Sequence, residues 1–194
     1  LLLTDFPYGT LNKRRNEWDK IIDYDKFWHH VDIICKPNCA IVSTAAQPFT
    51  SVLISTNYTN FKYCLVWEKS KSTGYLNAKK QPMRAHEDIV VFYKKQPTYN
   101  PQMTVGEPFK RQSKNPEGYV SKSNAHGYGL KPVKGFENKG TRYPKSIVNI
   151  SRDFSAQQQV HPTQKPVPLM EWLIKTYSNP GEVVLDNCMG SGST

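Results

Sequence analysis

The sequence predicts an α/β fold in which a parallel or mixed β-sheet is covered by helices on both faces. Short apolar runs typical of buried strands alternate along the chain with segments of helical periodicity. Of the 194 residues, 38% are hydrophobic and 12% are aromatic, which is enough to bury a core and excludes a largely disordered chain. A chain of this length is expected to form one domain that carries an insertion.

The first predicted elements are a strand and a helix. Residues 1–4 form an apolar run that ends at Asp5 and the turn Phe6-Pro7-Tyr8-Gly9, as at the carboxyl end of a parallel strand. A helix is expected over residues 25–35, with Phe27, Val31, Ile34 and Cys35 on its buried face. Further strands are expected at residues 40–42, 63–67 and 89–93, with a short helix after Gln47-Pro48 that passes through Val52 and Leu53.

Regular structure is also expected after residue 145. Residues 146–150 are predicted to form a short strand, and Pro166 suits the start of a helix. The buried face of that helix would consist of Met170, Leu173, Ile174 and Tyr177. Residues 182–186 are then predicted to form a strand with Val183, Val184 and Leu185 as its apolar core.

Residues 94–145 are predicted to be a basic insertion. They contain eleven Lys or Arg residues and three Glu residues, so they carry a net charge of +8 out of +10 for the whole chain. Lys and Arg neutralise phosphates, and the Tyr and Phe residues spaced between them can stack on unpaired bases. We therefore expect a nucleic-acid partner, with a solvated loop as the alternative.

The four cysteines are not spaced like the ligands of a zinc site, so no metal is expected and a reducing cytoplasm suits the chain. The sequence also lacks a run of about 18 apolar residues, so neither a membrane span nor a signal peptide is expected.

Residues 5–8 are the first candidate for chemistry. A reaction at the exocyclic amine of a nucleobase requires acceptors for the hydrogens of the amine and an aromatic face for the extruded base. Asp5 supplies a carboxylate, the carbonyl of Phe6 a second acceptor, Pro7 a stiff turn and Tyr8 the aromatic face. An ordinary turn after a strand is the alternative.

Two further segments contain candidate ligand-binding residues. Asp186 with Gly190 and Gly192 follows an apolar run, and glycines allow backbone amides to approach a ligand closely. The spacing differs from the dinucleotide fingerprint, which disfavours hydride transfer. Residues 161–166, His-Pro-Thr-Gln-Lys-Pro, precede the predicted helix, and Thr163 as its N-terminal cap is the alternative.

These three segments, in this order, resemble motifs of the amino-group-specific DNA methyltransferases of the β arrangement, the N6-adenine and N4-cytosine family. Residues 5–10 resemble the Asp-Pro-Pro-Tyr motif, and residues 161–166 resemble the His-Pro-Thr-Gln-Lys-Pro box. Residues 186–194 are similar to the Asp-x-Phe-x-Gly-Ser-Gly-Thr-Thr cofactor motif, with Cys188 in place of Phe. Trp18-Asp19, residues 76–82 and residues 142–144 look like the phage and prophage adenine-specific subgroup.

The resemblance implies a Rossmann-like S-adenosylmethionine-dependent methyltransferase fold with a mixed seven-stranded sheet in the full enzyme. The elements that follow the glycine loop in the family are not in this sequence, so we expect a fragment of a larger enzyme. Residues 1–93 would form the catalytic part of the core, residues 94–145 the target-recognition insertion and residues 146–194 the cofactor-binding part.

The implied reaction transfers a methyl group from S-adenosylmethionine to the exocyclic amine of adenine in DNA. Asp5 and the Phe6 carbonyl would hold the amine, Pro7 would shape the loop, and Tyr8 would stack on the base. The cofactor would be bound by Asp5, Thr163, Lys165, Asp186, Cys188, Gly190, Ser191 and Gly192. Candidate DNA-binding residues are Lys79, Lys80, Arg84, Lys110, Arg111, Lys114 and Arg142.

Three other functions remain open. Cytosine methylation uses the same fold, although that class more often begins its tetrapeptide with Ser, and methylation of RNA or of a protein amide is a second option. A nucleic-acid-binding module without a working cofactor site is the third. We expect a monomer or a homodimer.

Overall fold

The structure is a computed structural model that describes residues 1–11, 17–111, 136–151, 161 and 163–194. The chain divides into two compact units, one comprising Leu1–Gln102 with Lys145–Thr194 and the other comprising Met103–Pro144. None of the helices in the described residues has the length and hydropathy of a membrane span.

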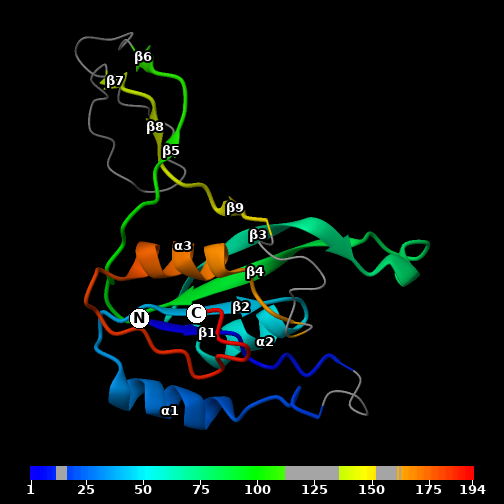
Figure 1. The fold of residues 1–194 in the computed structure, drawn as a ribbon. Coiled ribbons are helices and arrows are strands. Elements are labelled where there is room, and N and C mark those ends of the chain that lie inside the picture. The colour runs from blue at the N-terminus through cyan, green and yellow to red at the C-terminus, as the bar shows by residue number, and fades with distance from the viewer. Residues whose placement is uncertain (12–16, 112–135, 152–160, 162) are drawn as a thin grey trace, which may run out of the picture. The chain divides into compact units, whose positions relative to one another are not determined.

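The larger unit is built on a mixed five-stranded sheet (Figure 1). Its strands lie in the order β1 (Leu2–Thr4), β2 (Ile41–Ala45), β4 (Arg84–Phe92), β3 (Phe61–Thr73) and β9 (Ile147–Asn149). The pairs β1–β2 and β3–β9 are parallel, whereas β4 is antiparallel to both of its neighbours. The predicted mixed sheet is therefore confirmed.

Helices cover both faces of this sheet, as predicted (Figure 1). Helix α3 (Val167–Tyr177) contributes Leu169, Met170 and Leu173 to the core on one face. Helices α1 (Tyr24–Ile34) and α2 (Phe49–Thr56) form the core of the other face with side chains from β1, β2 and β4. Two separate hydrophobic cores therefore hold the sheet between them.

The buried face of α1 differs from the predicted one. Trp28 and Val31 are its buried residues, and Cys35 packs against the same core. Ile34 is 58% exposed, so its predicted burial is wrong. Positions 28, 31 and 35 follow the three- and four-residue spacing of one helical face, and Ile34 lies beside that face.

The predicted strand at residues 182–186 is reduced to one bridge. The Leu3 amide donates to the Leu185 carbonyl at 2.9 Å, and the Leu185 amide donates to the Leu1 carbonyl at 2.9 Å. Val183 is 82% exposed, so the expectation of a buried apolar core is wrong at this position.

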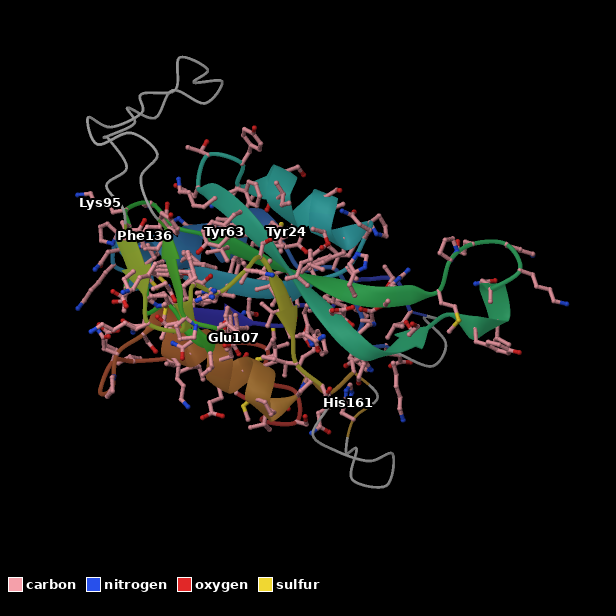
Figure 2. The ribbon with its side chains drawn as sticks, turned by 90° about the horizontal axis from the view of Figure 1, so that it is seen from above. Tyr24, Tyr63, Lys95, Glu107, Phe136 and His161 are labelled. Carbon is pink, nitrogen blue, oxygen red and sulfur yellow. The ribbon has the colours of Figure 1, made fainter. Side chains whose placement is uncertain are left out.

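Strands β3 and β4 extend well beyond their predicted apolar segments and form a long hairpin, whose far end runs away from the rest of the sheet in both views (Figure 1 and Figure 2). A 3₁₀ turn, η1 (Tyr75–Asn77), lies at its tip. In the far part of the hairpin, residues 70–73 and 84–86 are exposed and, apart from Ala85, polar. The two strands pair there through the backbone, which hydropathy does not reveal.

In the smaller unit, Met103–Pro144, residues 103–111 and 136–144 form two antiparallel strand pairs. Strand β5 (Thr104–Val105) pairs with β8 (Thr141–Arg142), and β6 (Phe109–Arg111) pairs with β7 (Phe136–Asn138). The unit lies inside the predicted insertion, and its role in target recognition stays a prediction.

Candidate active site

The three motifs line one cleft of about 700 Å³ in the larger unit. Residues 5–8 reach it from the end of β1, and His161, Thr163, Gln164 and Lys165 reach it from the segment before α3. The loop after the edge bridge contributes Asp186, residues 188–191, Ser193 and Thr194. Figure 2 shows His161 on the segment that leads to α3. Pockets of about 300–1,000 Å³ are typical of small-molecule and cofactor sites.

The Asp5 carboxylate is held by three donors. The Lys165 ammonium donates to one carboxylate oxygen at 2.7 Å. The Tyr8 hydroxyl donates to the other oxygen at 3.2 Å, and the Thr44 hydroxyl donates to that same oxygen. These contacts fix the orientation of a carboxylate that lines the cleft.

Lys165 is also part of a larger charge network. Its ammonium lies 3.8 Å from Glu87 Oε2, and Lys69 donates to Glu87 Oε1 at 3.3 Å. Both lysines are buried, so the two carboxylates and two ammonium groups balance one another beneath the cleft. Glu87 Oε2 has no hydrogen-bond partner among the described residues.

Sequence reasoning missed Thr44, Lys69 and Glu87. Each lies in a strand of the structure, two residues outside the apolar segment that the sequence predicts there. The available signal was the charge of Lys69 and Glu87 at positions next to the buried segments of β3 and β4.

Tyr8 is a half-buried aromatic residue on the wall of the cleft. Its ring stacks on Phe49, with centroids 4.7 Å apart and an interplanar angle of 20°. The Lys165 ammonium lies 5.6 Å from the ring centroid. Burial, and then the negative charge of Asp5, raise the pKa of Tyr8 well above its usual value, so its hydroxyl remains a hydrogen-bond donor at neutral pH.

The Phe6 side chain belongs to the core. It makes edge contacts with Phe27 and Tyr24, with centroids 4.8 Å and 6.2 Å away, and it is 3% exposed. The aromatic ring that stands in place of the second residue of the Asp-Pro-Pro-Tyr motif is therefore accommodated in the core. The predicted role of Phe6 belongs to its backbone carbonyl and not to its side chain.

The loop after Tyr8 is fixed by a buried carboxylate. The amides of Gly9 and Leu11 donate to the two carboxylate oxygens of Asp19, at 2.8 Å and 2.7 Å. Gly9 has φ = +66°, and a Cβ at this position would lie 2.6 Å from the Ile21 side chain, so the turn requires glycine. Asp19, which lies outside residues 5–8, therefore fixes the loop that follows them.

The glycine loop closes around Asp186. This carboxylate accepts a hydrogen bond from the Cys188 amide at 2.9 Å and another from the Thr194 hydroxyl at 2.5 Å. Gly190 and Gly192 have φ values of +53° and +75°, and a Cβ at either position would meet nothing closer than 3.8 Å. The backbone of the loop thus leaves open space beside it for a ligand.

The remaining predicted cofactor residues lie around the same cleft. Thr163 is not a helix cap, because Pro166 is the N-cap of α3 and the Thr163 hydroxyl lies 2.9 Å from His161 Nδ1. Cys188 is half-buried, and burial raises the pKa of its thiol. The volume, the acidic side chains and the open glycine backbone suit a nucleoside-containing cofactor with a cationic centre.

The predicted DNA-binding residues are found in both units. Lys79 and Lys80 are exposed at the tip of the β3–β4 hairpin, and Arg84, in the last strand pair before the tip, lines the cleft. In the smaller unit, Lys110 forms an exposed ion pair with Glu137 at 3.3 Å, and Arg111 ends β6. Lys114 lies outside the described residues.

Arg142 contacts other residues of the smaller unit. Its guanidinium lies 4.8 Å from the centroid of the Phe109 ring and donates to the Asn138 side chain and the Glu107 carbonyl. These bonds link β8 to β6 and β7. Its predicted contact with DNA would therefore compete with contacts that hold the unit together.

Comparison with known proteins agrees with the class that the fold and the site define. A family described as DNA methylase, the N6/N4 methyltransferases, matches residues 1–194. The chain therefore belongs to the N6/N4 DNA methylase family, and the predicted family is confirmed.

Several solved structures have a similar fold. The crystal structure of the M1.HpyAVI–SAM complex has 23% identity and a TM-score of 0.56, and the match covers 99% of this chain and 73% of that one. A structure of M1.HpyAVI has 17% identity and a TM-score of 0.53, covering 99% and 70%. The cytosine-N4-specific PvuII DNA methyltransferase has 15% identity and a TM-score of 0.60, covering 99% and 68%. They confirm the predicted Rossmann-like methyltransferase fold.

Proposed function

We propose that this protein transfers a methyl group from S-adenosylmethionine to the exocyclic amine of an adenine that is flipped out of duplex DNA. The observation that carries the proposal is the Asp5 carboxylate, oriented by Lys165, Thr44 and Tyr8 in the cleft that the glycine loop also lines. Membership of the N6/N4 DNA methylase family makes S-adenosylmethionine the methyl donor.

Asp5 retains the capacity to bind the amine. An ionised carboxylate has about four lone-pair sites on its two oxygens. Three donors use it within the described residues, which leaves one site for a hydrogen of the substrate amine. The Phe6 carbonyl, to which no described residue donates, supplies the second acceptor that the reaction needs.

These two acceptors would align the amine nitrogen with the methyl donor. When two reactants are held in line, the binding energy has already offset much of the entropic part of the activation barrier. When bound, the sulfonium of the cofactor supplies an activated methyl carbon, so the chain itself needs to provide chiefly orientation. Pro7 stiffens the turn between the acceptor groups and Tyr8.

Tyr8 provides the aromatic face for the extruded base. Phe49 already covers one face of its ring, so the base would stack on the other face. The stack of Phe49 and Tyr8 limits the motion of the ring. Because the ring is already oriented, less conformational entropy is lost when the base binds.

The cofactor would be bound on the other side of the Asp5 carboxylate, by the glycine loop. Asp186, Cys188, Gly190, Ser191 and Gly192 supply its polar groups and open backbone. Lys165 and Thr163 would close the site from the segment before α3. The similar fold of the M1.HpyAVI–SAM complex supports this placement.

Adenine is favoured over cytosine as the target base by the first residue of the tetrapeptide, since Asp5 stands where the cytosine class more often has Ser. The similarity to the cytosine-N4-specific PvuII enzyme makes N4-cytosine the alternative. The assignment of residues 94–145 to target recognition and of the chain to the phage and prophage subgroup belongs to the same proposal.

The test is an analysis of methylated nucleosides after incubation of the full protein with S-adenosylmethionine and mixed-sequence DNA. We expect N6-methyladenine in the wild-type reaction. The Asp5→Asn variant should lose activity by about 10²–10⁴-fold, while the control Asp23→Asn, at the exposed N-cap of α1, should keep it. N4-methylcytosine as the product would replace the adenine assignment, and an active Asp5→Asn variant would remove Asp5 from the reaction.

A further inference from the structure

The far part of the β3–β4 hairpin is a strongly basic projection. We call residues 69–84 the hairpin arm. Five of its sixteen residues are Lys or Arg, and none is Asp or Glu: Lys69, Lys71, Lys79, Lys80 and Arg84. Lys69 is buried and paired with Glu87, whereas the other four are exposed. A projection with charges of only one sign is suited to a polyanion and not to the mixed surface of an average protein partner.

The tip of the arm is an ordered turn. Gly74 has φ = +89°, the Asn77 amide donates to the Gly74 carbonyl at 2.9 Å, and the Ala78 amide donates to the Tyr75 carbonyl at 3.0 Å. The Lys80 amide then donates to the Asn77 carbonyl at 2.8 Å. The backbone is therefore held in one shape by consecutive bonds.

This ordered turn presents two large apolar side chains to solvent. Tyr75 is 78% exposed and Leu76 is 96% exposed. An ordered turn that holds exposed apolar side chains beside basic residues is typical of a contact surface.

The arm adjoins the proposed active site. Thr73 and Arg84 face each other as the last strand pair before the tip, and both line the cleft that contains Asp5. The turn with Tyr75 and Leu76 therefore begins one residue after the cleft wall. A duplex that delivers a base into the cleft would meet this turn.

We propose that the hairpin arm is a DNA-binding wedge: Lys79 and Lys80 bind phosphates, while Leu76 and Tyr75 pack into the base stack next to the flipped adenine. This inference rests on the proposed function. An extruded base leaves a gap in the stack, and apolar side chains inserted between base steps stabilise the distorted duplex. The wedge would thereby favour the extruded state of the base.

The wedge is tested with the double variant Tyr75→Ala/Leu76→Ala and two DNA substrates. One is a duplex that the wild type methylates, and the other places an abasic site opposite the target base, so that the base is already unpaired. We expect kcat/KM to fall at least tenfold on the paired duplex and less than twofold on the abasic one. The matched control Ile33→Ala/Tyr58→Ala removes two exposed apolar side chains, 68% and 76% exposed, from α1 and from the turn after α2.

Equal losses on both substrates, or no loss on either, would overturn the wedge. Fluorescence of 2-aminopurine at the target position measures base extrusion without methyl transfer. If the wild type extrudes this base but forms no N6-methyladenine on the matched duplex that has adenine at the same position, the proposed function fails while the wedge remains.

The phosphate contacts have a separate readout that needs no recognition sequence. Each phosphate neutralised contributes about −0.9 to the slope of log affinity against log salt for duplex DNA. Lys79→Gln/Lys80→Gln should therefore flatten the slope by about 1.8. The control Lys36→Gln/Lys62→Gln changes two lysines outside the arm and should leave the slope unchanged. If Lys79→Gln/Lys80→Gln has the wild-type slope, the arm does not contact DNA.

Discussion

The ammonium group of Lys165 lies 2.7 Å from the Asp5 carboxylate, although 160 residues separate the two in the chain. This ion pair joins the segment before α3 to the end of β1, and it draws in Glu87 from β4. The proposed catalytic carboxylate is thus held by a residue of the second motif. The two motifs are connected parts of one site.

The free-energy coupling between Lys165 and Asp5 should be measurable in a double-mutant cycle. With Lys165→Met, Asp5→Asn and the double variant, urea unfolding should give a stabilising coupling of about 0.5–3 kcal/mol, as for other contacting residues. Lys165→Met alone should be the least stable variant, because it leaves two carboxylates without their shared partner. The exposed pair Lys26–Asp23 is the control, with an expected coupling of at most about 0.5 kcal/mol. A coupling no larger than that of the control would mean that the pair has no energetic role.

Tyr8 should act through its ring and not through its hydroxyl. Base–aromatic stacking contributes about 1–3 kcal/mol, so Tyr8→Ala should lower kcat/KM by about 5- to 150-fold. Tyr8→Phe should keep most of the activity, because Lys165 and Thr44 still orient Asp5. Methylation kinetics on one DNA substrate would compare the two variants, with cofactor affinity as the check on folding. Losses of similar size would assign the role to the hydroxyl.

Tyr24→Phe should stabilise the protein or leave it unchanged at pH 7. The Tyr24 hydroxyl is buried and has no hydrogen-bond partner among the described residues. An unsatisfied buried hydroxyl is unfavourable by about 1–3 kcal/mol, which the Phe side chain avoids. Urea unfolding of both proteins at pH 7 measures the difference. A clear loss of stability would show that the hydroxyl has a partner.

The same variant should change the response to alkaline pH. Burial, and to a lesser extent Cys188, raise the pKa of Tyr24 from 10.0 to about 12. Between these values the unfolded chain releases a proton that the folded protein retains, so the free energy of unfolding falls as pH rises from 10 toward 12. Tyr24→Phe should therefore lose less stability in this range than the wild type. Tyr58→Phe, at an exposed position, should follow the wild type.

The core of the fold could be predicted because it depends on apolar periodicity. Strands β1, β2 and β9 and helix α3 lie where short apolar runs and a helical face predicted them. Two features could not be predicted in this way. The far part of the β3–β4 hairpin is polar and pairs through its backbone, and residues 182–186 are apolar but make only one bridge.

The candidate site was predicted in part for a similar reason. The motifs lie at the ends of strands or before a helix, so topology brings them to one cleft. Thr44, Lys69 and Glu87 come from strands, and a single sequence does not reveal their distant partners: Asp5 for Thr44, and each other for Lys69 and Glu87. Arg142 was predicted to bind DNA from its charge alone, which does not reveal its bonds to Asn138 and Glu107.

The basic residues of the smaller unit should supply DNA affinity without sequence preference. Lys110 is paired only at the surface with Glu137, a contact that contributes little to stability and leaves the ammonium accessible to a phosphate. Neutralising Lys110, Arg111 and Lys114 together should flatten the dependence of log affinity on log salt by up to about 2.7, at about 0.9 for each phosphate contact. Binding should weaken similarly on unrelated duplexes, whereas cofactor affinity should not change, because the cofactor motifs lie in the other unit. Fluorescence anisotropy at several salt concentrations measures the slope. The triple variant combined with Lys79→Gln/Lys80→Gln should add the two effects if both regions contact phosphates independently, and an unchanged slope in the triple variant would leave the hairpin arm as the principal electrostatic contact.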